Sequence, residues 1–296
     1  MSIFSKNQLW SMALYKVDNG FLFNTKLNNA LKVFNTKKIR TSVKHVHTLA
    51  DPFLFIKNNI LYLFYESMSV GQRGTIEAKA THDLKDFKEL GCVLNEDFHL
   101  SYPFVFEHNR SVFMIPETIN AHAVFLYKFS DFPIKLERTR TFLVGDYADS
   151  SIIKHNEIWY LFTSSINGFE IYYTDDLENG ELTAHPKNPI SRDWKYQRCG
   201  GGPVLLNNIL FRIAQDCSVY YGRNINIFKI TELTPENYKE ELYKENYFEC
   251  NQEWNNLGGH HFSFADFNGS KIIATDGKQY DYYINKLLSP LFKFTG

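Results

Sequence analysis

The chain has 296 residues, of which 44% are hydrophobic and 16% aromatic, with 26 Phe and 18 Tyr. Its formal net charge of −1 excludes the strong positive field that draws proteins to nucleic acid or to acidic membrane surfaces. The aromatic excess favours β-strands, and the length is sufficient for one large all-β domain.

The first twenty residues lack a continuous apolar segment followed by a small-residue cleavage site, so we expect no signal peptide. No apolar stretch of the sequence is long enough to span a bilayer. Cys92, Cys199, Cys217 and Cys250 are far apart and form no CxxC pair, which is typical of reduced thiols. These features predict a cytoplasmic protein.

Five segments, spaced about fifty residues apart, repeat one pattern: an apolar run, a turn rich in Asn, His or Gly, and a second apolar run. In chain order they are DPFLFIKNNILYLFYE from Asp51, YPFVFEHNRSVFMIPE from Tyr102, DSSIIKHNEIWYLFTS from Asp149, GPVLLNNILFRIAQD from Gly202 and HFSFADFNGSKIIATD from His261. Each segment is a β-hairpin signature, and this period in a strand-rich chain is typical of propeller blades.

The repeat therefore predicts an all-β fold, a five-bladed β-propeller with about four antiparallel strands per blade. The expected blades are 47–97, 98–145, 146–196, 197–254 and 255–283, within a single domain of residues 1–296. Residues 1–46 are expected to supply a leading strand, in WSMALYKV, that closes the ring. Weak helical periodicity is confined to PENYKEELYKE, from Pro235 to Glu245.

The C-terminal sequence YYINKLLSPLFKFTG, which includes the tail of residues 284–296, mixes large apolar residues with Lys286 and Lys293. A segment of this kind can lie on a membrane surface or dock a partner protein, and it can also pack against its own domain. Peripheral contact of the tail with a membrane or a partner protein is therefore one hypothesis.

The hairpins also predict where polar side chains meet. In a propeller the innermost strand of a blade follows the central channel and the next strand returns, so the start of the first and the end of the second lie at one face. A concave mouth ringed by polar groups is the default ligand site. The strand starts are Asp51, Tyr102, Asp149, Gly202 and His261, and the strand ends are Glu66, Glu117, Ser164, Asp216 and Asp276.

The unit ADPFLF…YLFYE and the later unit DSSI…WYLF resemble blades one and three of the five-bladed glycosidase propellers, namely the arabinanases, β-xylosidases and their invertase relatives. The segments HLSYPFVFE, MIPET, WYLFTS, HPKNPI, AQD and GHHF resemble more closely the propeller domain associated with glucosamine inositolphosphorylceramide transferases and with bacterial polysaccharide-synthesis proteins. The resemblance covers residues 45–280. Its motifs are more specific for the fold than for the reaction.

The resemblance to the glycosidases implies roles for three positions. An Asp that opens blade one is their general base, an Asp that opens blade three tunes the acid, and a Glu that opens blade four is the general acid. Asp51 and Asp149 match the first two, whereas Gly201, in RCGGGP, stands where the acid is expected. Glycosidases ordinarily need two carboxyl groups across the scissile bond. A phosphate-linked sugar needs instead a group that receives the phosphate charge, so the missing acid favours glycosyl transfer.

On this hypothesis Asp51 deprotonates the acceptor and Asp149 and Glu117 hold the sugar. Arg198, Arg212 and the glycine run around Gly201 receive phosphate, although such a run is also typical of a plain tight turn. The other expected substrate-binding residues are Glu66, Tyr102, Gln215, Asp216, His260, His261, Asp276 and Lys278.

His260 and His261 can be ligands in the channel or a hydrogen-bonded structural pair. No close spacing indicates a zinc site, so we assign no metal ligand, although a divalent cation could be held in the central channel by oxygens from several blades.

The expected partners are an activated sugar donor and a glycan or glycolipid acceptor, as in surface polysaccharide or glycolipid assembly. Two alternatives stay open. One is a glycoside hydrolase with a relocated acid at Glu117 or Asp216, and the other is a non-catalytic glycan-binding propeller.

Overall fold

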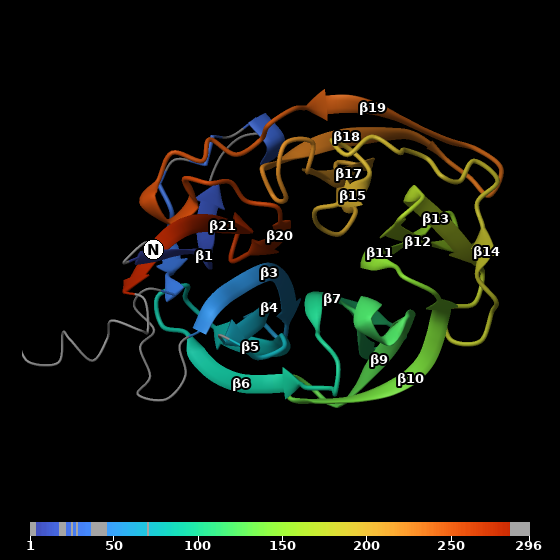
Figure 1. Cartoon of the computed structure of the whole chain (residues 1–296). Helices are drawn as coiled ribbons and strands as arrows, with labels where there is room; N and C mark the ends of the chain where they lie inside the picture. The colour runs from blue at the N-terminus through green and yellow to red at the C-terminus, as the bar shows by residue number, and fades with distance from the viewer. Residues whose placement is uncertain are drawn as a thin grey trace, which may run out of the picture.

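The computed structural model describes residues 4–17, 22–24, 26–27, 29–36, 46–69 and 71–284. Over these ranges the chain forms β-strands, with short 3₁₀ helices at Leu22–Asn24, Ile119–Ala121 and Glu253–Asn255 and no α-helix. None of the helices described has the length and apolar character needed to cross a membrane. The sheets are arranged around a common centre, as in a β-propeller (Figure 1).

The predicted hairpins are present as antiparallel strand pairs that face the centre of the ring (Figure 1). They are β3 (Val46–Lys57) with β4 (Ile60–Ser69), β7 (Ser101–His108) with β8 (Ser111–Glu117), β11 (Ala148–His155) with β12 (Ile158–Ser165), β16 (Val204–Leu206) with β17 (Ile209–Asp216), and β20 (Phe262–Phe267) with β21 (Ser270–Ile284).

Further antiparallel strands extend four of these pairs outward. They are β5 (Thr75–Thr81) and β6 (Lys88–Leu94) beside β4, β9 (Ala123–Asp131) and β10 (Lys135–Val144) beside β8, β13 (Gly168–Thr174) and β14 (Thr183–Ala184) beside β12, and β18 (Asn224–Leu233) and β19 (Tyr238–Lys244) beside β17. The two-residue strand β15 (Arg198–Cys199) pairs with the C-terminal end of β17.

Strand β1 (Phe4–Val17) links the two ends of the chain. It pairs antiparallel with β21 along its whole length, and β2 (Lys32–Phe34) pairs with its other edge. The segment WSMALYKV, expected to supply a leading strand, lies in β1. A single parallel pair, Trp10 opposite Thr48, joins β1 to β3 and merges the first and last strand groups into one eight-stranded sheet. Counted by hydrogen bonds the described strands form four sheets, so a grouping into five blades stays a prediction.

The tight turns explain why the hairpins could be located in the sequence. Each inner hairpin turns through two consecutive residues with positive φ, which is the geometry of a type I′ turn. Asn is the common choice because its short polar side chain tolerates the left-handed conformation. The turns are Asn58–Asn59, Asn109–Arg110, Asn156–Glu157, Asn207–Asn208 and Asn268–Gly269.

Large apolar side chains fill the spaces between neighbouring sheets and hold the ring together. One cluster joins Phe64 of β4 to Val105 of β7 and Met114 of β8. Another joins Phe211 of β17 to Phe262 of β20. Because each sheet buries both faces against its neighbours, the inner strands are held firmly around the centre.

The helix indicated by the periodicity of residues 235–245 is not formed, so this prediction is wrong. This segment contains β19, which pairs with the edge of β18 and buries Tyr238 while its remaining side chains are mostly exposed. The cross-strand hydrogen bonds outweigh a local helical preference of a few tenths of a kcal/mol per residue.

All four cysteines are free, as expected. Tyr282–Ile284 belong to β21, and the rest of the tail, with Lys286 and Lys293, lies outside the described residues.

Candidate functional site

The inner strands β3, β7 and β11 share a kink at the residue that opens each repeat. Asp51, Tyr102 and Asp149 have φ of 51°, 46° and 54°, and the pairing register shifts beside each of them. Positive φ is costly for residues with a side chain, so its recurrence at equivalent positions marks a conformation that the surrounding structure enforces.

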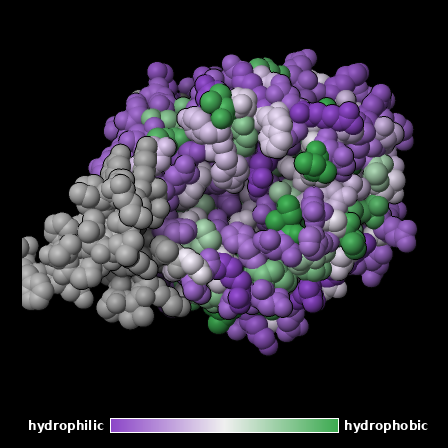
Figure 2. Space-filling model, in the orientation of Figure 1, coloured by the Kyte–Doolittle hydropathy of each residue, from purple (hydrophilic) through white to green (hydrophobic). Residues whose placement is uncertain are grey.

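The backbone N–H of each kinked residue donates a hydrogen bond to an acid from the preceding strand group. Asp51 N–H binds Asp276 Oδ2 (3.2 Å), Tyr102 N–H binds Asp51 Oδ2 (3.2 Å), and Asp149 N–H binds Glu117 Oε2 (3.1 Å). These bonds pass from one strand group to the next and draw the acids toward the centre. Figure 2 shows a hollow at the centre of this face, with hydrophilic residues inside it.

Asp276 is the most fully engaged of these acids. Its Oδ1 accepts the N–H groups of His260 (2.8 Å) and His261 (3.1 Å), and its Oδ2 lies 2.6 Å from His260 Nδ1. Although burial acts to raise the pKa of Asp276, its electrostatic interaction and hydrogen bonds with His260 lower it to about 2. Asp276 is therefore an ionised clamp on the histidine pair.

Asp51 has one oxygen fixed and one turned toward the histidines. Oδ2 accepts the Tyr102 N–H, while Oδ1 lies 3.7 Å from His260 Nδ1 and 3.6 Å from His261 Nδ1. Burial, and then the negative charge of Asp276, raises the pKa of Asp51 well above its ordinary value. A carboxylate with a raised pKa is a stronger base when it is ionised.

Asp149 lies in a small ionic network with Glu117 and Arg198. Arg198 Nε is 2.5 Å from Asp149 Oδ2, and Arg198 Nη2 is 3.5 Å from Glu117 Oε2. Gln215 donates from Nε2 to Asp149 Oδ2 (3.1 Å) and to the Cys199 carbonyl (2.7 Å), so it orients Asp149. Burial raises the pKa of Asp149 to about 7, against the opposing effect of Arg198.

Glu66 lies beside this network and close to His99. Its Oε1 is 3.5 Å from His99 Nε2, and His99 Nδ1 accepts the Gly74 N–H (2.9 Å). Burial, and then the charge of Glu117, raises the pKa of Glu66 to about 8. At neutral pH Glu66 is therefore largely protonated and can donate a hydrogen bond.

Asp51, His260 and Asp276 each bring one ligand atom within 4.8 Å of the others, a spacing that a metal ion can bridge. Both oxygens of Asp276 already accept backbone N–H groups, and the set lacks the six to eight oxygens that calcium takes. A divalent cation in the channel stays a prediction.

Residues 26–278 match the family model described as glucosamine inositolphosphorylceramide transferase 1, N-terminal. The chain belongs to this family. The protein of that name from Arabidopsis thaliana is 33% identical over 241 residues, which cover 76% of this chain and 31% of the relative. The Oryza sativa subsp. indica protein is 32% identical over 244 residues, or 77% of this chain and 33% of the relative. The chain thus spans about a third of the length of these relatives.

The fold of this family member is similar to that of solved glycoside hydrolases. A glycosyl hydrolase from Bacteroides ovatus superposes with a TM-score of 0.58 at 9% identity, over 77% of this chain and 83% of the other. An α-L-arabinofuranosidase from Clostridium thermocellum gives 0.56 at 13% identity, over 76% and 80%. The expected resemblance to both groups is confirmed, and at these identities the hydrolases inform on the fold alone.

In this family member, Gly201 leaves no space for a general acid. Its φ is 154°, and a Cβ at this position would lie inside van der Waals contact of the Phe262 carbonyl oxygen. Phe262 N–H donates to the Gly200 carbonyl (2.8 Å), and a Cβ on Gly202 would clash with the Phe104 ring. The glycine run therefore packs tightly against other strands, and the expected role in phosphate binding is not supported by its geometry.

Arg212 and Asp216 are engaged away from the centre. Arg212 is 1% exposed and pairs with both carboxylate oxygens of Glu240 (2.5 and 2.7 Å), so its expected role in receiving phosphate is wrong. Asp216 accepts the Ser218 N–H (2.9 Å) and lies 2.7 Å from Arg223 Nη1. It fixes the turn after β17, which argues against its expected contact with substrate or its role as a relocated acid.

Three further expected ligand contacts lie inside the structure. The Tyr102 ring is fully buried and packs edge-on against His261, which is itself fully buried. Burial lowers the pKa of His261 to about 3, so it is neutral. Lys278 is buried and donates to the Tyr221 carbonyl oxygen. These buried side chains pack around the central residues and are not available to contact a ligand.

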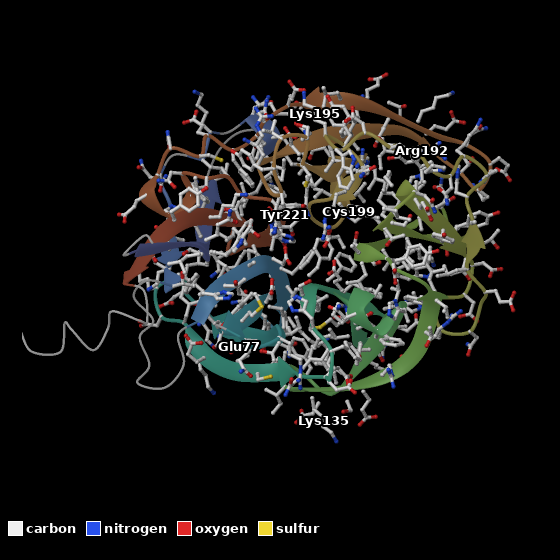
Figure 3. The ribbon with its side chains drawn as sticks, in the orientation of Figure 1. Glu77, Lys135, Arg192, Lys195, Cys199 and Tyr221 are labelled. Atoms are coloured by element: carbon white, nitrogen blue, oxygen red, sulfur yellow. The ribbon has the colours of Figure 1, made fainter. Side chains whose placement is uncertain are left out.

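The repeat pattern missed Tyr221, Trp10 and His99, because none of them occupies a strand start or a strand end. Tyr221 meets the His260 ring edge-on, with centroids 5.0 Å apart, and Trp10 stacks on His260 at 4.3 Å. Figure 3 shows Tyr221 and Cys199 near the centre of the ring, whereas Lys135 lies at its perimeter. The exposed YY pair after the AQD motif was the sequence signal that could have located Tyr221.

Proposed function

We propose that this chain binds a sugar at the centre of the ring and acts in glycosyl transfer, with Asp51 as the general base. The convergence of Asp51, Glu66, Glu117 and Asp149 from three strand groups carries the proposal. Carboxylates accept hydrogen bonds from sugar hydroxyls, and protonated Glu66 can also donate one. A concave centre with a few convergent polar groups is the usual form of a small-molecule site.

The proposed reaction has one proton transfer at Asp51. The acceptor hydroxyl gives its proton to Asp51 Oδ1 while the acceptor oxygen bonds to the anomeric carbon of the donor. The bond from that carbon to the donor phosphate breaks, and its electron pair leaves with the phosphate. Such a leaving group needs no proton, which is consistent with the absence of a carboxyl group at Gly201.

The name of the relatives suggests the class of sugar. An amino sugar such as glucosamine carries an ammonium group, and a centre with several buried carboxyl groups would attract that charge. Of the cations expected to receive phosphate, Arg198 is the one that lies at this centre, where its side chain is 28% exposed. A phosphate-linked donor would then compete with Asp149 for the guanidinium group.

Hydrolysis is the second candidate, because Glu66 supplies a proton donor that the sequence did not identify. A carboxyl group with a pKa of about 8 stays protonated at neutral pH and is suited to act as a general acid. Water would then replace the acceptor hydroxyl, with Asp51 as its base. The glycan or glycolipid acceptor, the cytoplasmic location and the non-catalytic alternative stay predictions.

A product screen separates these functions. The chain would be incubated with nucleotide-linked glucosamine and other nucleotide sugars, with and without glycan and glycolipid acceptors, and with aryl glycosides. Mass spectrometry would then follow all products. Acceptors that gain one sugar mass, with release of the nucleotide, support transfer. Free sugar from aryl glycosides supports hydrolysis instead, and binding of glycans without any turnover would refute both reactions.

A further inference from the structure

The loop between β17 and β18 exposes three consecutive apolar side chains. Val219, Tyr220 and Tyr221 are 71%, 48% and 47% exposed. Apolar surface is stabilised when it is removed from water, so the exposure of three such side chains in a row is costly unless a ligand covers them. Clusters of exposed apolar residues commonly mark ligand-binding or interaction sites.

Hydrogen bonds and an ion pair hold the loop in place, so its apolar side chains are not exposed merely because the loop is flexible. The carboxylate of Asp216 binds the Ser218 N–H and Arg223 at its two ends, and Lys278 donates to the Tyr221 carbonyl oxygen. Gly222 has φ of 65°, and a Cβ there would lie 2.8 Å from the Trp10 ring. The aromatic rings are therefore presented by a rigid support, which lowers the entropic cost of binding a ligand.

The exposed rings continue the central site. The Tyr221 ring meets His260 edge-on at 5.0 Å, and the guanidinium carbon of Arg198 lies 5.2 Å from its centroid. Tyr220 lies next in the chain, and Lys278 Nζ is 4.6 Å from its ring centroid. Figure 3 shows Tyr221 at the inner side of the ring of sheets. Tyr221 therefore borders the centre, and Tyr220 lies beside it in the chain, within reach of a ligand that extends out of the centre.

We propose that Tyr221 and Tyr220 form a second sugar-binding subsite, in which the apolar face of a pyranose ring packs on the aromatic rings. The proposal rests on the proposed function, because the first sugar must occupy the central carboxyl cluster. The preferred ligand is then an oligosaccharide of at least two residues.

Charge favours a sugar over a lipid surface as the occupant. Two of the three described cations beside the loop are paired with carboxylates: Arg198 with Asp149, and Arg223 with Asp216. The third, Lys278, is buried and donates to the Tyr221 carbonyl oxygen. The centre itself is rich in carboxyl groups, whereas lipid surfaces are bound by clusters of uncompensated Lys and Arg. Aromatic side chains with an apolar face and a polar edge suit a ligand that is apolar on one face and polar at its rim.

The test compares the affinities of glucosamine and of its β-1,4-linked disaccharide, measured by isothermal titration calorimetry. Wild-type protein should bind the disaccharide about tenfold more tightly than the monosaccharide, the gain expected from roughly 1.4 kcal/mol of added contact. Tyr220→Leu and Tyr221→Leu should each reduce that ratio to less than about threefold. Tyr221→Phe should restore it, because the ring is kept. Ile134→Ala, an exposed apolar residue in the β9–β10 turn, should keep the wild-type ratio.

The outcomes separate the two proposals. If the wild type binds glucosamine but binds the disaccharide no more tightly, the subsite is refuted while the central site stands. Leu variants with an unchanged ratio refute the subsite as well. If the wild type binds neither sugar, the proposed function fails for this class of sugar, and the subsite fails with it.

Discussion

The N–H of Asp51 donates to Asp276 Oδ2 across 3.2 Å, although the two residues are 225 positions apart in the chain. The same carboxylate holds His260 and His261, so one buried group fixes both the proposed base and the histidines that face it. The geometry of the central site therefore depends on a hydrogen bond between the first and last hairpins of the repeat.

Removing this clamp should destabilise the whole fold. Asp276→Ala leaves three backbone N–H groups without their acceptor, and we expect the free energy of unfolding to fall by about 3–5 kcal/mol. Urea unfolding followed by tryptophan fluorescence measures the change. Asp266→Ala, which removes a largely exposed partner of Lys271, should change stability by less than about 0.5 kcal/mol. Equal effects for the two variants would contradict the assigned role of Asp276.

Glu66 should make stability fall as the pH rises through neutrality. Its pKa is about 8 in the folded protein, against an ordinary value of 4.5, so the folded state binds more protons than the unfolded state between these values. Stability due to this group is therefore present at low pH and is lost as pH approaches 8. Glu66→Gln should remove at least about 1 kcal/mol of the decline between pH 5 and pH 8, measured by urea unfolding. As a control, Glu107→Gln, which alters an ion pair at the surface, should show the same dependence of stability on pH as the wild type. If Glu66→Gln also showed the wild-type dependence, the assigned pKa of Glu66 would be wrong.

Substitution of Gly201 and of Gly91 by alanine tests whether the glycine run is tightly packed, with Gly91 as the control. Both have positive φ, but a Cβ on Gly91 meets nothing within 4 Å, whereas one on Gly201 would clash with the Phe262 carbonyl oxygen. Gly91→Ala should cost about 1 kcal/mol and Gly201→Ala at least about 3 kcal/mol, as determined by chemical denaturation. A Gly201→Ala protein as stable as Gly91→Ala would show that the run has open space, as an anion site or a lost general acid requires.

Arg212 should behave as a structural residue. Because Arg212→Ala leaves Glu240 partly buried without its partner, we expect a loss of about 3–5 kcal/mol in thermal or chemical unfolding. Lys154→Ala, at an exposed pair with Glu157, should have an effect below about 0.5 kcal/mol. If Arg212→Ala instead kept full stability and lost affinity for inorganic phosphate, the phosphate role first expected from the sequence would be restored.

The sequence was sufficient for the hairpins because their determinants are local. Asn58 and Asn59, and the matching pairs in the other hairpins, mark turns whose two residues both need positive φ, and the flanking apolar runs fix the register. When the repeated hairpins close into a ring, the first and last hairpins lie side by side, which brings Asp51 next to Asp276. The central acids could therefore be predicted as one group.

The errors concern residues whose environment is set by distant strands. Arg212 is a buried ion pair because Glu240 lies two strands away, a contact that no local pattern encodes. The packing of Gly201 depends on Phe262, and the exposure of Tyr221 depends on a loop anchored by Lys278. The raised pKa of Glu66 likewise arises from burial beside Glu117, which only the folded ring produces.

The most direct test of the central claim is the turnover of Asp51→Asn, measured by mass spectrometry with the donor and acceptor identified in the product screen. Asn retains an oxygen that can accept the Tyr102 N–H, so the fold should persist while the base is lost. We predict that transfer falls by about 10²–10⁴-fold, with the unfolding transition of the protein retained. Transfer at the wild-type rate by Asp51→Asn, or no transfer by the wild type with any donor, would contradict the account.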